Sequence, residues 1–231
     1  MRIFSLMALL VPLAASAAQA GLSDTIEKRV AACTACHKAN EQGDAFFPRI
    51  AGKPAGYLYN QLLNFKEGRR QYPMMTYMVE QLPEAYLREI AQYFSDQHAP
   101  YPPPAATSAT PQMIERGRLL VHEGDPSRKV PACISCHGDS MTGVAPAIPG
   151  LIGLPRDYIN AQFGTWRNQK RKAHAPDCMA EVANRLSESD VAAVSGWLAA
   201  QPADPDMRPA TSLPKELPMA CGGVPQEKNT P

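Results

Sequence analysis

The sequence predicts an all-α fold in which two small helical modules follow one another along the chain. Three observations support this prediction. The five-residue pattern C-x-x-C-H occurs at Cys33–His37 and again at Cys133–His137, and the residues after each copy stay in register. A proline-rich segment at 99–110 separates the two copies. Alternation of apolar and polar residues with the period of a β-strand is nowhere sustained.

The chain begins with a segment typical of a secretory signal peptide. Arg2 is followed by a mostly apolar run over residues 3–15, and Ala18-Gln19-Ala20 matches the A-x-A cleavage pattern. The run is shorter than the roughly 20 residues that a spanning helix needs, so cleavage is predicted in place of a retained anchor. No later stretch is long and apolar enough to cross a bilayer. The mature protein is therefore expected in an exported, oxidising compartment, the periplasm of a bacterium, without a stable transmembrane segment.

Composition and the positions of the proline-rich segments divide the chain into five parts. They are a signal peptide (1–20), a first module (21–98), a linker (99–110), a second module (111–201) and an irregular proline-rich tail (202–231). The tail is expected to be either disordered or a strap over the surface. Loss of the leader removes one of 23 basic residues against 22 acidic ones, a balance that gives no argument for nucleic-acid binding.

Each module is predicted to hold three helices in the same order. They cover 22–34, 54–67 and 83–97 in the first module, and 111–123, 155–169 and 187–200 in the second. The middle helices match residue by residue on one face, with Tyr57, Gln61 and Phe65 answered by Tyr158, Gln162 and Trp166. Pro83 is placed in the first turn of its helix, and the S-x-x-D pattern from Ser187 to Asp190 predicts a capped helix start.

The repeated cysteine pattern allows a zinc site, a redox dithiol or a covalent haem anchor. Two C-x-x-C pairs could supply four zinc ligands, but here they lie in separate repeats. A thioredoxin-type dithiol occurs near a βαβ unit, and the sequence of this chain predicts no such unit. In c-type haem attachment, Cys33, Cys36, Cys133 and Cys136 form thioethers, and His37 and His137 supply an axial nitrogen. Two haem c groups are therefore predicted, and they would also help to fill thin cores in modules of only about 80–90 residues.

Methionines at matched positions are the candidates for the other axial position. Met75 and Met179 each stand seven residues before a leucine that introduces the last helix, Leu82 or Leu186. A thioether ligand raises the reduction potential of haem iron relative to a second histidine. Met75 and Met179 are therefore the predicted ligands, with Met74 and Met78 as close competitors of Met75 in the first module.

With these residues, the chain resembles the dihaem cytochrome c4 family. The similarity lies in both C-x-x-C-H patterns, Pro48–Gly52, the middle helices, Gly68-Arg69-Arg70 and the methionines, and extends to about Gln201. The resemblance implies two class I cytochrome c domains related by a pseudo-twofold axis, with haem propionates close together at the interface. It also implies that the carbonyls of Pro48 and Pro149 accept hydrogen bonds from the two histidines. The family carries electrons in the bacterial periplasm, often towards a terminal oxidase.

Cys178 and Cys221 depart from the family pattern. Cys178 and Cys221 are expected to form a disulfide that holds the tail near the second haem; the alternatives are two unpaired cysteines, or Cys178 as the iron ligand. His98, His122 and His174 are interpreted as surface residues, with His174 a minor rival ligand. The basic runs Arg69-Arg70 and Lys170–Lys172 are interpreted as solvated helix ends, with propionate pairing or an acidic partner as alternatives.

Two functions follow from the sequence. The first is an electron carrier without catalytic residues, whose two His/Met-ligated haems exchange electrons with a respiratory complex, a terminal oxidase or a periplasmic dehydrogenase. The second is an enzyme, or a haem subunit of one, in a system such as thiosulfate or alcohol oxidation. The matched methionines favour the carrier, because they leave neither iron an open position.

Overall fold

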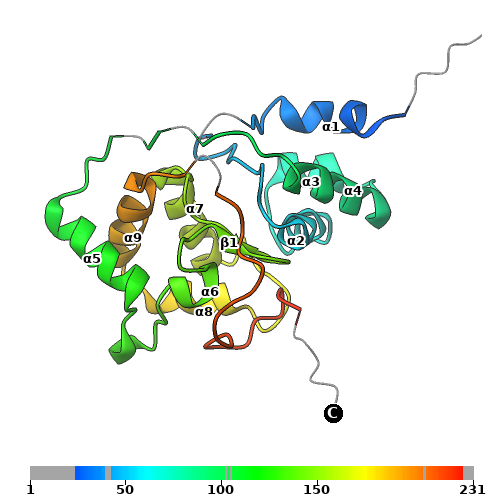
Figure 1. Ribbon diagram of the computed structural model, residues 1–231. Helices are drawn as coiled ribbons and strands as arrows, with labels where there is room; N and C mark the ends of the chain where they lie inside the picture. The colour runs from blue at the N-terminus through cyan, green and yellow to red at the C-terminus, as the bar shows by residue number, and fades with distance from the viewer. Residues whose placement is uncertain (1–23, 40–42, 102, 105, 205–206, 226–231) are drawn as a thin grey trace, which may run out of the picture.

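The computed structural model describes residues 24–39, 43–101, 103–104, 106–204 and 207–225. The first half contains α1 (Ile26–Thr34), α2 (Ala55–Lys66), α3 (Pro73–Val79) and α4 (Glu84–Ser95). The second half contains α5 (Pro111–His122), η1 (Pro126–Arg128), α6 (Ile134–His137), β1 (Gly143–Val144), β2 (Ile148–Pro149), α7 (Arg156–Arg167), α8 (Cys178–Arg185) and α9 (Glu188–Ala200). The two sets of helices gather side by side as separate groups (Figure 1). The all-α prediction is confirmed, with β1 and β2 forming one short antiparallel pair.

All six predicted helices are present within the described residues, but α3 and α8 were not predicted. Both are short, and both carry a candidate axial methionine. Pro73 occupies the first turn of α3, and the Asp177 carboxylate accepts a hydrogen bond from the Ala180 N–H at the start of α8. These two start signals were available in the sequence. The helices were missed because runs of seven and eight residues carry little periodicity.

The start of α9 has the predicted cap. The Ser187 hydroxyl accepts a hydrogen bond from the Asp190 N–H at 3.1 Å, and the Asp190 carboxylate accepts one from the Ser187 N–H at 3.0 Å. This reciprocal pair is a capping box. Pro83 lies one position outside α4, as its N-cap, and not in its first turn as predicted.

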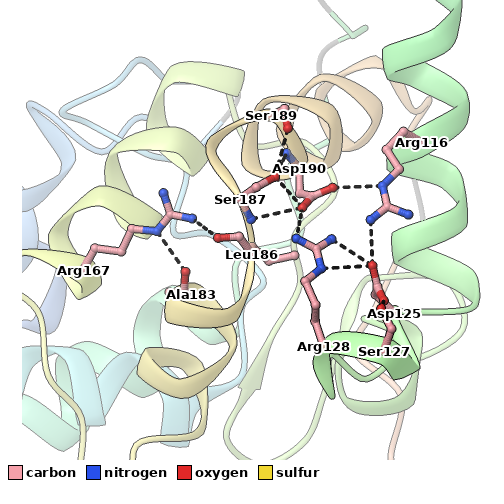
Figure 2. Close-up of polar contacts among 10 residues, drawn as sticks. All are labelled: Arg116, Asp125, Ser127, Arg128, Arg167, Ala183, Leu186, Ser187, Ser189 and Asp190. Atoms are coloured by element: carbon pink, nitrogen blue, oxygen red, sulfur yellow. Dashed lines mark hydrogen bonds and ion pairs between the residues drawn. The ribbon is translucent and has the colours of Figure 1, made fainter.

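The capping aspartate also belongs to an ion network that joins three segments (Figure 2). Asp190 pairs with Arg116 of α5 at 2.9 Å and with Arg128 of η1 at 2.6 Å. Asp125 binds the same two guanidinium groups, at 2.9 and 2.8 Å. The side chain of Asp190 is only 6% exposed. The network therefore fixes η1, which leads into the second cysteine pattern, against both α5 and α9.

Helices α5 and α9 pack more closely than ordinary side chains allow. A Cβ built on Gly117 would stand 2.3 Å from the carbonyl oxygen of Ala193 and 2.7 Å from the Cβ of Trp197. Glycine at this position lets the two backbones approach.

The hydrophobic cores of the two halves differ. The second half has one continuous core that includes Leu120, Phe163, Val194 and Leu198. The first half has two smaller clusters, one around Leu58 and Phe94 and the other around Phe65, Val79 and Leu87. None of the helices in the described ranges has the length and apolar character of a membrane span. The signal peptide at 1–20 lies outside the described residues, and the domain boundaries remain a prediction.

The described part of the tail is a strap over the second half of the protein. Ala203 and Met207 pack against its core, and the backbone of Ala210 exchanges hydrogen bonds with Gly143 and Ala145 beside β1. The orange-to-red segment in Figure 1 follows this path from α9 past β1. Of the two expectations for the tail, the strap is confirmed for residues 207–225.

Candidate haem sites

The two C-x-x-C-H segments fold into the same local structure. In each, the carbonyl of the first cysteine accepts hydrogen bonds from the N–H groups of the second cysteine and the histidine, at 3.2 and 2.9 Å in both copies. This tight turn keeps Cys33 near Cys36, and Cys133 near Cys136. Each histidine follows directly in the same turn, so a ligand and two thiols lie within one short segment. None of these four thiols is in a disulfide.

Both histidines are held in one tautomer. The Nδ1–H of His37 donates to the Pro48 carbonyl and that of His137 to the Pro149 carbonyl, both at 2.8 Å. A carbonyl can only accept, so Nδ1 carries the proton and Nε2 keeps a lone pair for a metal. Burial lowers the pKa of both imidazoles, which favours the neutral form that ligates. These contacts agree with the orientation that the family resemblance implies.

A single cavity of about 510 Å³ joins the two halves. Its walls include predicted haem-site residues from both: Cys33, His37 and Met75 from the first, and Cys136, His137 and Met179 from the second. In the first half the cavity is lined by residues of both apolar clusters, among them Leu58 and Phe65. A large planar cofactor between these clusters would complete the split core.

Burial distinguishes the three methionines of α3. Met75 is half-buried, packs against the cluster around Phe65 and lines the cavity. Met74 and Met78 are 51% and 36% exposed, and neither lines the cavity. Met179, the second residue of α8, is half-buried and packs against the second core. The geometry therefore favours Met75 over its two rivals.

Cys178 is bonded to Cys221, with 5.1 Å between the Cα atoms. The expected disulfide is present, and the sulfur of Cys178 is not free to bind iron. The interpretation of His98 and His122 as surface residues is correct. For His174 it is wrong, because this side chain is half-buried and lines the cavity. Its Nε2 lies 3.1 Å from a guanidinium nitrogen of Arg69, the contact that draws it inward.

The interface between the halves is built around two arginines at matched positions. Arg70 donates to Gln61 in its own half at 2.9 Å and to Gln162 across the interface at 2.8 Å. Arg171 donates to Gln162 in its own half at 2.6 Å and to Gln61 across the interface at 3.1 Å. The backbones beside them also pair, since the N–H of Lys172 donates to the Arg69 carbonyl. Interpreting both basic runs as solvated helix ends is therefore wrong for Arg70 and Arg171, although Lys170 and Lys172 are exposed.

Three side chains that line the cavity, those of Arg70, Arg171 and Trp166, have no anionic partner among the described residues. Among the described residues, no carboxylate pairs with Arg70 or with Arg171, which is 6% exposed. The indole Nε1 of Trp166 is buried without a hydrogen-bond partner, and the Arg171 guanidinium lies over that ring at 3.9 Å. Haem carries two propionates, which would supply anionic acceptors here. The residues present therefore fit haem in their chemistry.

A buried lysine crosses from the first half to the second. The Nζ of Lys53 donates to the Gly150 carbonyl at 2.8 Å, next to the carbonyl of Pro149 that holds His137. Burial, with a smaller contribution from nearby Arg49, lowers the pKa of Lys53 to about 7. The matched residue in the second half is Leu154. Sequence reasoning missed Lys53, and its only signal was a lysine where the repeat places a leucine.

A scan of family models matches residues 27–97 to cytochrome c. The chain is 37% identical to a thiosulfate dehydrogenase electron acceptor of Thiomonas intermedia, over 76% of this chain and 81% of that protein. It is 31% identical to cytochrome c4 of Pseudomonas aeruginosa, over 74% and 85% of the two chains. The crystal structure of reduced cytochrome c4 from Pseudomonas stutzeri superposes with a TM-score of 0.62 at 29% identity, covering 75% of this chain and 95% of that one.

Proposed function

Because this chain belongs to the cytochrome c4 family, and so is a dihaem electron-transfer cytochrome with two covalently bound haem c groups, we propose that it accepts electrons from a thiosulfate dehydrogenase. The supporting observation for two coupled haems is that residues of both candidate sites line one cavity. The identity to a thiosulfate dehydrogenase electron acceptor supports the choice of donor.

In this proposal each haem is held by one C-x-x-C-H segment. Cys33 and Cys36 would hold the first haem through thioethers, and His37 and Met75 would ligate its iron. Cys133, Cys136, His137 and Met179 would do the same for the second. Each haem supplies a one-electron Fe(III)/Fe(II) couple. The protein's own residues fix the imidazoles through Pro48 and Pro149 and line the cavity with apolar walls that exclude water. Arg70 and Arg171, which also line the cavity, would supply cations for the propionates.

The proposed compartment is the bacterial periplasm, in keeping with the leader pattern at 1–20 and the disulfide between Cys178 and Cys221. The protein itself is proposed to have no catalytic residue. With a methionine and a histidine on each iron, neither haem has a free position for a substrate.

The test is rapid mixing of the oxidised dihaem protein with purified thiosulfate dehydrogenase and thiosulfate. We expect reduction of both haems, and no reduction when the dehydrogenase is omitted. A chain that stays oxidised in the complete mixture, yet is reduced at once by ascorbate, would show that its donor is a different protein. Uptake of carbon monoxide by the reduced wild-type protein would instead contradict two six-coordinate irons.

Replacing Lys53 by leucine, its counterpart in the second half, is expected to lower the potential of the second haem at pH 6. A unit charge roughly 10–15 Å from a redox centre, at an effective dielectric constant near 20, contributes about 1–2 kcal/mol. For one electron this corresponds to about 40–90 mV. The sign follows from charge, because a cation disfavours the ferric state. Spectroelectrochemical titration of each haem measures the shift.

The pH dependence of this potential provides the control. Below pH 7 Lys53 is charged; as the pH rises through about 7 it becomes neutral, so the wild-type potential should fall and approach that of K53L by pH 8.5. Lys28→Leu removes an exposed charge from α1 and should leave both potentials unchanged. Equal shifts in K53L and K28L would rule out a specific role for Lys53.

A further inference from the structure

The large exposed apolar side chains of the described residues all belong to the first half. They are Phe46, Met74, Tyr77 and Met78. Three of them lie on α3, where positions 74, 77 and 78 share one helix face. Tyr77 is 77% exposed, and no residue between Pro73 and Val79 carries a charge. Single exposed hydrophobic residues are ordinary, but a group on one face marks a contact surface.

The duplication supplies an internal comparison for this face. With Met75 matched to Met179, the residues corresponding to Met74, Tyr77 and Met78 are Cys178, Glu181 and Val182 of α8. The chain itself covers part of that face of α8, although Glu181 stays exposed. Cys178 is bonded to Cys221, and Pro218 and Met219 line one hollow with Glu181 and Arg185.

The same strap also forms part of the cavity wall beside the second half. Leu217, Met219 and Val224 line the cavity wall, and the Asn60 side chain of α2 donates to the Gly223 carbonyl at 2.9 Å. The α8 side, beside the proposed second haem, is thus occupied by residues 217–224. The α3 side, beside the proposed first haem, has no such cover among the described residues.

We propose that the apolar face of α3 formed by Met74, Tyr77 and Met78 is the docking surface for the thiosulfate dehydrogenase, so that electrons enter at the first haem. This inference rests on the proposed function. An uncharged face selects a partner with a matching apolar patch, and small contacts of this kind suit the short-lived complexes of redox proteins. In each encounter the partner's redox centre loses one electron and the first haem iron passes from ferric to ferrous, with no bond made or broken. The second haem then receives its electron from within the molecule.

The test is stopped-flow reduction of the oxidised dihaem protein by thiosulfate dehydrogenase with thiosulfate. Tyr77→Lys and Met74→Lys each place a charge on the face, and we expect the second-order rate constant to fall about tenfold or more. Gln112→Lys adds the same charge to an exposed site on α5 and should react like the wild type. Ascorbate should reduce all four proteins at the same rate, which separates docking from damage to the haem site. The wild-type rate should change little between low and high salt, since the face has no charge.

The outcomes separate the two proposals. If the dehydrogenase reduces the wild type and all three variants equally fast, or if the wild-type rate falls steeply with salt, the docking face is wrong and the proposed function stands. If the dehydrogenase does not reduce the wild type at all, the proposed function fails and the inference fails with it. A loss confined to Y77K and M74K supports both.

Discussion

Replacing Met179 by histidine is expected to lower the reduction potential of the second haem by on the order of 0.2 V, because imidazole stabilises ferric iron better than a thioether does. The structure places Met179 at the start of α8, half-buried against the second core and in the wall of the cavity that His137 also lines. The change should be visible as a shift of one of two one-electron steps in a spectroelectrochemical titration.

The duplication and the neighbouring residues provide matched controls. Met75→His should move the other step in the same direction, whereas Met78→His, on the exposed face of α3, should move neither. Replacing both Cys178 and Cys221 by serine should leave the ligand field of the second haem intact, since that disulfide holds the strap and not the iron. An unchanged potential in M179H would mean that another group occupies the sixth position.

Replacing Asp190 by alanine is expected to reduce the free energy of unfolding by about 2–3 kcal/mol. Removing one partner from a fully buried ion pair costs about 3–5 kcal/mol, and we expect a smaller loss here because Arg116 and Arg128 are 39% and 33% exposed. The variant also loses the capping box of α9. Urea unfolding of the haem-loaded protein at pH 7 measures the difference.

The matched control for Asp190 is Glu188→Ala, which removes an exposed carboxylate from the first turn of the same helix. It should cost under about 0.5 kcal/mol. Burial raises the pKa of Asp190, but hydrogen bonds from Arg128, Ser187 and Arg116 outweigh burial and hold it well below the usual value. The stabilisation is therefore fully present above about pH 4 and is lost as the pH falls below it, so D190A and wild type should converge in acid. Equal losses in D190A and E188A would contradict a special role for the network.

The repeat, the six longer helices and the haem chemistry could be predicted from the sequence. These features are local or periodic: C-x-x-C-H is five adjacent residues, and the matched faces of α2 and α7 follow helical spacing. The matched capping contacts support the register used to pair Met75 with Met179, since Lys66 donates to the Leu82 carbonyl and Arg167 to that of Leu186. Figure 2 shows the second of these contacts.

The neighbours of each side chain could not be predicted in this way, because they depend on tertiary contacts. The repeat favoured Met75 but left Met74 and Met78 as alternatives, and burial against Phe65 distinguishes the three. Arg171 was interpreted as a solvated charge, yet it lies buried across the interface from Gln61. Lys53 reaches the carbonyl of Gly150, a residue 97 positions away. Such contacts depend on how the two halves of the chain pack together, and no local sequence pattern encodes that packing. The haem sites could therefore be predicted from short motifs. The buried charges, the strap and the exposed apolar face around them follow from the fold.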